Sequence, residues 1–410
     1  MQLLAQLRGN APWAASLQFR DFRLLCGATL LNALGSGMEQ VAVGWLIFDM
    51  TGSAFLVGAA SAARMAPFFF LGILSGAVAD RVERRIFLRF ITLAGSGTAG
   101  LMALLLLSGT AQVWSILALT TLAGGVFAFA LTTRQAYAYD IVGPARALNG
   151  LSLTAMSMQA GGICGALISG AMIQGVGPGW QYVGISGCYF AAVLVLLATS
   201  KVEQLQGSRR ESVLKNVAGY FQIIRENRIL LVLMCLAAVT EIFGFTHMTL
   251  LPVFAKEVLH LGPVGLGFLT AVRQSGGIMG LIFLASLREF RRKGILMFAL
   301  ATGFGVGLMA FSISSNLFLF LAVLALVNAC AMSVDTLYKT LMQDNVPDEQ
   351  RGRAMGSWVL SIGFAPVGHL GVGGLASMLG APGALLINGA ILTFVSLAAA
   401  ASLPKIRHLR

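Results

Sequence analysis

KVEQLQGSRRESVLKNVAGYFQIIRENR, residues 201–228, is the only long polar connection in this chain, and it divides the sequence into two halves of similar length. On each side of it, apolar stretches of helix length follow one another with short loops between them. A helix of roughly 20 mainly apolar residues is long enough to cross the hydrocarbon core of a bilayer. We therefore predict an all-α polytopic membrane protein made of two helix bundles.

The apolar stretches predict twelve membrane spans, six on each side of this linker. The first six cover residues 24–48, 54–79, 86–107, 113–131, 151–173 and 182–200, and the last six cover residues 229–254, 266–287, 295–313, 317–337, 355–379 and 384–403. Only 11% of the residues are charged and 57% are hydrophobic, which excludes a soluble fold. We divide the chain into an N-terminal six-helix bundle at 1–200, a cytoplasmic linker at 201–228 and a C-terminal six-helix bundle at 229–410.

The two halves resemble each other weakly, as copies of one six-span unit would. GAASAAR at residues 58–64 in the second span matches GFLTAVR at residues 267–273 in the eighth. A parallel duplication relates two halves by a pseudo-two-fold axis along the membrane normal, with the substrate site between them. Within the linker, apolar residues recur at spacings of three and four over residues 213–224. This spacing predicts an amphipathic helix on the cytoplasmic membrane face.

The basic residues indicate how the chain is oriented. Of the 28 Lys and Arg residues, all except Arg64, Lys256 and Arg273 lie near the termini, on every second loop or in the linker. By the positive-inside rule, both termini and the linker are then cytoplasmic. The net charge of +12 follows from this topology, and its clusters lack stacking aromatics, so we expect no nucleic-acid partner. The five cysteines lie in spans without metal-ligand spacing, so we expect no metal site.

The loop after the second span carries a motif. GAVADRVERR at residues 76–85 resembles the signature G-x-x-x-D-R-x-G-R-R of the major facilitator superfamily, with Glu83 in place of the second glycine. The resemblance implies the major facilitator fold and a gate on the cytoplasmic side. In the second half, Glu289 and the basic residues after it form a degenerate copy. The gate would comprise Gly76, Asp80, Arg81, Arg84, Arg85 and Glu289. The alternative is that the arginines only set the topology.

Other segments narrow the resemblance to one branch of that superfamily. TGS at 51–53, RQA at 134–136 and VPDEQRGR at 346–353 are similar to the transmembrane secretion effector group, which includes enterobactin-exporter-like and macrolide-efflux-like proteins. The resemblance implies export across a bacterial inner membrane. It also adds Arg351, Gly352 and Arg353 to the cytoplasmic gate. GGICGALISG at 161–170 resembles the antiporter motif of exporters, although an alanine replaces its proline.

Few ionisable residues interrupt the predicted spans, and each costs roughly 2.5–3.5 kcal/mol at the bilayer centre, so each is a functional candidate. They are Glu39, Arg64, Glu241, Arg273 and Asp335. Counted along their helices, Glu39 and Arg64 lie at similar depth, and Glu241 and Arg273 could form a second pair. Asp335 precedes Lys339 by one helical turn, which predicts a local ion pair.

Two roles are open for the buried charges. Glu39 and Glu241 could couple transport to protons, because opening to either side changes the balance between desolvation and attraction to arginine. They could also form static ion pairs that hold helices together. Arg64 and Arg273 offer donors for a carboxylate, catecholate or phosphate, while the glutamates would equally suit a cationic drug. Asn32, the repeat counterpart of Glu241, and His247 complete the candidate site, although both also suit packing roles.

The chain contains no nucleotide-binding loop of the type G-x-x-x-x-G-K-S/T and no large extramembrane domain. We therefore expect no enzyme and no cofactor, with a proton gradient as the energy source. The main hypothesis is a monomeric secondary transporter, in contact with membrane lipids, that exports a small amphiphilic molecule such as a siderophore or hydrophobic drug by alternating access. The alternatives are proton-coupled uptake of a small anionic metabolite, and a lipid-translocating protein with structural charges.

Overall fold

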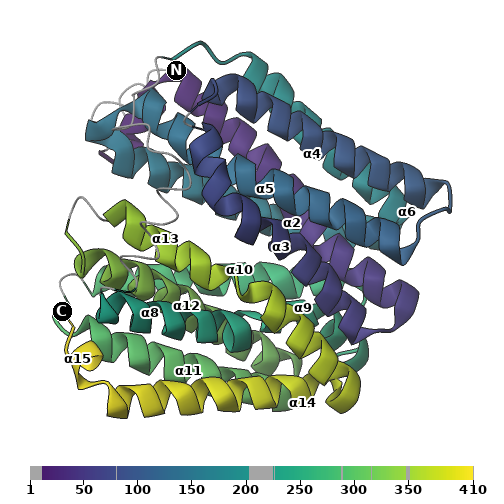
Figure 1. The fold of residues 1–410 in the computed structure, drawn as a ribbon. Coiled ribbons are helices and arrows are strands. Elements are labelled where there is room, and N and C mark those ends of the chain that lie inside the picture. Colours follow the sequence, from purple (N-terminus) through teal and green to yellow (C-terminus); the bar gives the residue numbers. More distant parts are fainter. Residues whose placement is uncertain are drawn as a thin grey trace.

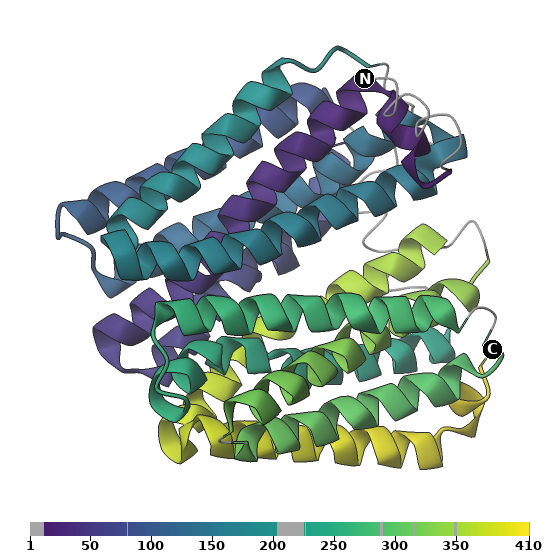
Figure 2. The same ribbon diagram turned by 180° about the vertical axis from the view of Figure 1, so that it is seen from behind.

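The computed structural model describes residues 12–79, 81–202, 225, 227–287, 290–314, 316–347 and 351–409. Within these ranges nearly every residue is helical and no strand is present. Figures 1 and 2 show two groups of long helices, one built from α2 to α6 and the other from α8 to α15. Both ends of the chain lie at the same end of the molecule, which we name the terminal end, and the opposite end is the distal end.

The first group is built from long apolar helices and two short 3₁₀ turns. Its elements are η1 Pro12–Gln18, α2 Arg20–Thr51, α3 Ala54–Ala79, α4 Arg84–Leu107, α5 Val113–Val142, η2 Pro144–Arg146 and α6 Ala147–Leu197. α6 is two antiparallel segments, because Gly177 has a φ of 86° and is followed by Pro178. The amide of Gln181 donates to the hydroxyl of Ser169, whereas these residues would be roughly 18 Å apart on one continuous helix.

The second group follows the same plan with more interruptions. Its elements are α8 Arg228–Val239, η3 Thr240–Phe245, α9 His247–Val253, η4 Phe254–Val258, α10 Pro263–Ser286, α11 Lys293–Ile313, α12 Leu317–Asp344, α13 Arg351–Ile362, α14 Ala365–Ser402 and α15 Pro404–Arg407. η3 and η4 are π-helical turns. Together with α8 and α9 they form one helical run, Arg228–Val258. α14 is interrupted at Gly380, whose φ is 74°.

The predicted spans fall on helical residues, although the span at 229–254 is divided among α8, η3, α9 and η4, and the span at 355–379 between α13 and α14. The protein is a multi-pass membrane protein of the all-helical class predicted. Eight helical runs in the described residues are long and apolar enough to cross a membrane. The count of twelve crossings stays a prediction. One boundary was wrong: α5 extends to Val142, so Arg134 lies inside a helix and not on a basic loop. Most of the predicted linker, including its amphipathic helix, lies outside the described residues.

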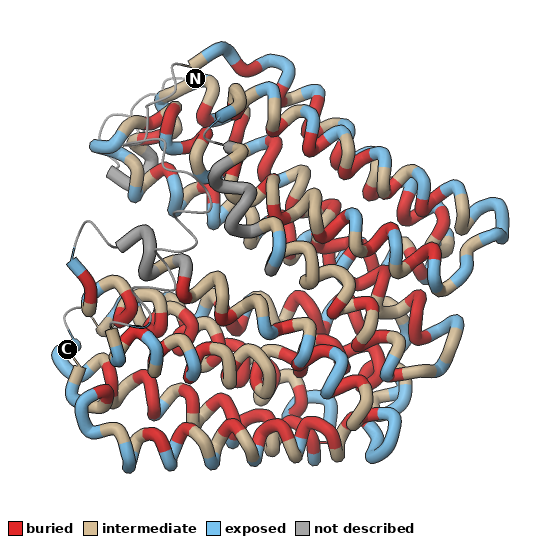
Figure 3. The backbone as a smooth tube through the Cα atoms, in the orientation of Figure 1, coloured by how far each residue is buried: buried red, intermediate tan, exposed pale blue. Residues whose placement is uncertain are grey.

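Among the described residues, the apolar core that the two groups share lies toward the distal end, where Figure 3 shows buried segments of both groups together. There, one cluster of buried side chains joins Val41 and Leu46 of α2 to Leu251 of α9 and Phe254 of η4. Each of the other two buried clusters is formed by residues of a single group, the second group in one case and the first in the other. Toward the terminal end the two groups of helices diverge in both views (Figures 1 and 2).

Small residues allow the close approach of the two groups. A Cβ atom on Gly267 of α10 would lie 2.4 Å from the carbonyl oxygen of Ala166 in α6. A Cβ on Gly58 of α3 would lie 2.4 Å from the carbonyl oxygen of His369 in α14. Real Cβ atoms do not come so close to backbone oxygens, so these two helix crossings require glycine. Close crossings of this kind drive helix association in membranes, where apolar surface alone does not.

Candidate functional site

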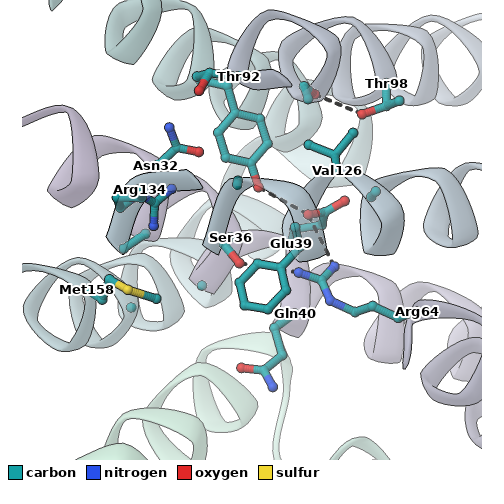
Figure 4. Close-up of a pocket in the computed structure, with 18 of the residues that line it drawn as sticks. Asn32, Ser36, Glu39, Gln40, Arg64, Thr92, Thr98, Val126, Arg134 and Met158 are labelled. Atoms are coloured by element: carbon teal, nitrogen blue, oxygen red, sulfur yellow. Dashed lines mark hydrogen bonds and ion pairs between the residues drawn. The ribbon is translucent and has the colours of Figure 1, made fainter. Parts of the chain in front are cut away.

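A cavity of about 210 Å³ lies among α2, α3, α4, α5 and α6 (Figure 4). Gln274 of α10, in the other group, also lines it. Three charged side chains of the described residues line it, and they are Glu39, Arg64 and Arg134. Asn32, Ser36 and Gln40 add neutral polar groups from the same face of α2. Drug-sized ligands occupy sites of roughly 300–1,000 Å³, so in this conformation the cavity holds only part of a larger solute.

Glu39 and Arg64 form a buried ion pair at the distal end of this cavity. Arg64 Nη1 lies 3.2 Å from Glu39 Oε2, and Arg64 Nη2 donates to the hydroxyl of Ser36 at 3.2 Å. The hydroxyl of Tyr189, in the second segment of α6, donates to Glu39 Oε2 at 3.1 Å. Glu39 is only 6% exposed. A buried carboxylate of this kind persists because a cation and hydrogen bonds replace its water.

Glycines on neighbouring helices bring these groups together. A Cβ on Gly35 of α2 would lie 2.7 Å from the ring of Tyr189, so its absence lets that ring cross α2 and reach Glu39. A Cβ on Gly124 of α5 would lie 2.0 Å from the carbonyl oxygen of Arg64. α5 therefore crosses α3 at Arg64 itself. The close crossings thus hold α2, α3 and α5, which carry or support the ion pair, at the distances that the pair requires.

The second predicted pair does not form. Arg273 does not line the cavity; its Nη2 instead donates to Gln40 Oε1 of α2 at 3.3 Å, a contact between the two groups. Glu241 lies in the π-helical turn η3, within electrostatic range of Asp335 and Lys339. Because a π-helical turn inserts an extra residue into a helix, it rotates the side chains that follow away from the faces of a regular α-helix. Arg273 and Glu241 therefore have different neighbours, Gln40 of α2 for the one and Asp335 and Lys339 for the other.

Asp335 and Lys339 form the local ion pair predicted from their spacing. Lys339 Nζ lies 2.7 Å from Asp335 Oδ2, and Trp358 Nε1 donates to Asp335 Oδ1 at 2.7 Å. The ammonium of Lys339 also lies 4.0 Å from the centre of the Trp358 ring. With Glu241 nearby, this arrangement is a second polar cluster, confined to the second group of helices.

Asn32 and His247, the two remaining candidate residues, lie in different groups of helices. Asn32 lines the cavity, as Arg134 does (Figure 4). His247 is fully buried in α9, where Nδ1 lies 2.8 Å from the carbonyl oxygen of Gly244 and the ring meets Phe304 edge to face. This position fits a packing role for His247.

The predicted cytoplasmic gate is only partly within the described structure. Arg84 Nη1 lies 2.7 Å from Asp140 Oδ1 and joins α4 to α5 inside the first group. Arg85 Nη2 lies 3.0 Å from Glu83 Oε1, and Arg81 is exposed. Asp80 and Glu289, and the side chains of Gly76, Arg351, Gly352 and Arg353, lie outside the described part of the chain. The gate between the two groups therefore stays a prediction.

Lys256, the one basic residue on an opposite-side loop, has a specific contact. Its Nζ lies 2.6 Å from Asp49 Oδ1 of α2, so an ion pair joins the two groups at the distal end. The same ammonium lies 5.6 Å from the centre of the Trp45 ring and 5.8 Å from that of Phe48. We call these four residues the distal latch.

Sequence reasoning missed several residues of the cavity. Tyr189, Ser36 and Gln274 are uncharged and fit an apolar span, so hydropathy offered no signal for them. Arg134 did offer one, because RQA at 134–136 follows the fourth predicted span directly, but it was assigned to a loop. Only the length of α5 places it in the cavity.

Residues 10–409 match the family described as transmembrane secretion effector, so the chain belongs to that family. The resemblance of its motifs is thereby confirmed. The staphyloferrin A transporter of Staphylococcus aureus is 23% identical over 84% of this chain and 86% of its own. The enterobactin exporter of Citrobacter koseri is 25% identical over 95% and 93%. The multidrug efflux pump Tap of Mycobacterium tuberculosis is 25% identical over 87% of both chains.

Solved structures show the same fold. A nucleoside transporter, NupG, superposes with a TM-score of 0.77, covering 92% of this chain and 99% of the other at 14% sequence identity. The helix arrangement is thus the major facilitator fold, as the motifs implied.

Proposed function

We propose that the protein is a proton-coupled exporter of an amphiphilic organic solute. The observation that carries this proposal is the buried Glu39–Arg64 ion pair on a cavity of the first helix group that Gln274 of the second group also lines. Buried charges in membrane helices commonly mark ion and substrate paths. The relatives named for siderophore export and multidrug efflux supply the direction of transport and the amphiphilic class of solute.

The orientation follows from the basic loops. With both termini and the linker on the cytoplasmic face of a bacterial inner membrane, the terminal end faces the cytoplasm. The conformation described is then closed outward by the distal latch and the glycine crossings. The two six-helix units at 1–200 and 229–410 would rock about the cavity, and outward opening would require the latch to separate.

Proton coupling would act through Glu39. When its carboxylate takes up a proton from the outside, it loses its charge and no longer attracts Arg64. The ion pair that joins α2 to α3 is then weakened, and Arg64 becomes available to other partners. Return to the inward conformation, where Arg64 again lies beside Glu39, would release the proton to the cytoplasm. No cofactor takes part in this cycle, and the solute leaves in exchange for the proton.

The proposal can be tested in everted membrane vesicles with an acidic interior. Export then runs into the vesicle, so addition of a transported siderophore or hydrophobic drug should release interior protons and raise the fluorescence of a pH-quenched dye. Glu39→Gln keeps the shape of the side chain and should abolish this release. Glu257→Gln, the same change at an exposed residue, is the matched control.

Equal release by wild type and Glu39→Gln would remove Glu39 from the mechanism. No release by a well-inserted wild-type protein across the panel would reject proton-coupled export. Solute accumulation driven in the opposite direction would favour uptake, and lipid movement independent of pH would favour a lipid-translocating protein.

A further inference from the structure

Arg134 is a buried cation for which the described part of the chain supplies no counter-ion. It is only 6% exposed, and none of the described residues forms an ion pair or hydrogen bond with its guanidinium. By contrast, Arg64 and Arg84 each face a carboxylate at 3.2 Å or less. Leaving one member of a buried pair uncompensated destabilises a folded protein by about 3–5 kcal/mol. A guanidinium in this position with no partner among the described residues is therefore expected to destabilise the protein.

The charge of Arg134 is aimed at the cavity. Glu39 cannot compensate it, because its own partner is Arg64. The cavity lining therefore carries a net positive charge from the described residues. Its apolar surface comes from Met65, Val126, Phe127, Ala130 and Met158. A solute that fits both features has an apolar body and an ionised acidic group.

Arg134 lies at the cytoplasmic side of the cavity. Counted from the distal ends of their helices at about 1.5 Å per residue, Arg134 is roughly 30 Å along α5 and Arg64 roughly 15 Å along α3. Asn32, at roughly 28 Å along α2, is at the level of Arg134, and both residues line the cavity (Figure 4). A solute entering from the terminal end would meet Arg134 and Asn32 before the Glu39–Arg64 pair.

The second group contributes a donor to the same cavity. Gln274 of α10 lines it, and its Oε1 lies 2.6 Å from where a Cβ on Gly162 would be. The glycine therefore makes room for this amide. Counted in the same way, Gln274 is roughly 16 Å along α10, at the level of the Glu39–Arg64 pair. A solute that extends from Arg134 to Gln274 would therefore contact both groups of helices.

We propose that Arg134, assisted by Asn32, is the anion-binding subsite of the cavity, and that the exported solute carries a carboxylate or another ionised acidic group. The planar guanidinium binds such a group through two parallel hydrogen bonds, and the amide of Asn32 offers a further donor. This inference deepens the proposed function and rests on it. It excludes purely cationic drugs as the preferred solutes.

The test compares two solutes that differ only in charge. Everted vesicles with an acidic interior are given pyrenebutyrate or its uncharged amide, and accumulation and proton release are recorded. Wild type should move the acid at least about tenfold faster than the amide, because a charged hydrogen bond contributes enough for a factor of that size. Arg134→Gln should lower acid transport roughly ten- to hundredfold and leave the amide unchanged.

Two further variants separate charge from structure. Arg134→Lys keeps the charge and should recover part of the preference for the acid, whereas Arg146→Gln removes an exposed arginine outside the cavity and should change nothing. Equal transport of acid and amide by wild type, or equal loss of both in Arg134→Gln, would overturn the inference while leaving proton-coupled export intact. A wild-type protein that moves no tested solute with protons would reject the proposed function, and the inference with it.

Discussion

The distal latch predicts a measurable shift between conformations. The ion pair of Asp49 and Lys256 has side chains 55% and 39% exposed, so it contributes only about 0–1 kcal/mol. Each ring beneath Lys256 adds about 0.5–1 kcal/mol at such a site. Replacing Lys256 by methionine should therefore destabilise the outward-closed state by about 1–2 kcal/mol, which changes the ratio of the two states by a factor of roughly 5–30.

Distances between spin labels at the distal end would report this change. Trp114 at the start of α5 and Phe318 at the start of α12 are both strongly exposed and lie in different groups. Cysteines at these two positions, in a chain without its five native cysteines, carry the labels. Lys256→Met should increase the ratio of the long-distance to the short-distance population by the factor given above. The exchanged pair Asp49→Lys with Lys256→Asp should restore part of the closed population, because it restores the ion pair without the original ring contacts.

The outcome that refutes this reasoning is equally specific. Neither Lys256→Met nor Asp49→Asn then changes the ratio of the long-distance to the short-distance population by more than about twofold. Such a result means that the latch contributes less than about 0.4 kcal/mol to the free-energy difference between the two conformations, and that it does not bias them. Glu257→Gln, next to Lys256 but exposed, controls for a general effect of altered charge on this loop.

Two further predictions concern packing and charge inside the helices. Gly267→Leu places a side chain where even a Cβ would lie 2.4 Å from the carbonyl oxygen of Ala166. The spin-label distances should therefore lengthen, and transport should fall. Unchanged distances would contradict the close crossing. Asp140→Ala removes the carboxylate that lies 2.7 Å from Arg84. It should lower the free energy of unfolding by about 3 kcal/mol, which a lower thermal-unfolding midpoint would show. The double variant Asp140→Ala with Arg84→Met should recover most of this stability, and no recovery would argue against the pair.

Much of the fold could be predicted from the sequence because hydrophobic length and loop charge are local signals. The Glu39–Arg64 pair was predictable for a similar reason: a regular rise of about 1.5 Å per residue converts sequence position into depth. The same counting failed for Glu241 and Arg273, because depth in the membrane does not determine which neighbouring helix a side chain faces. Arg273 contacts Gln40 of α2, and Glu241 lies near Asp335 and Lys339.

The other misses depend on contacts between distant segments. Arg134 follows the end of the apolar signal, and only packing against neighbouring helices extends α5 past it. The contact of Lys256 with Asp49 joins residues from the two halves, and its partner could not be chosen from either loop alone. Hydropathy identifies where the chain lies in the membrane, whereas the lining of the cavity depends on how the helices cross.

The measurement that tests the central claim most directly is proton movement driven by the solute alone. Purified protein is reconstituted in liposomes without a pH gradient, and a gradient of the transported acid is imposed. Wild type should move protons against the direction of the solute and generate a pH difference, as should Glu257→Gln, while Glu39→Gln should generate none. Solute flux without any pH change in wild type, or an equal pH change in Glu39→Gln, would contradict proton exchange through Glu39.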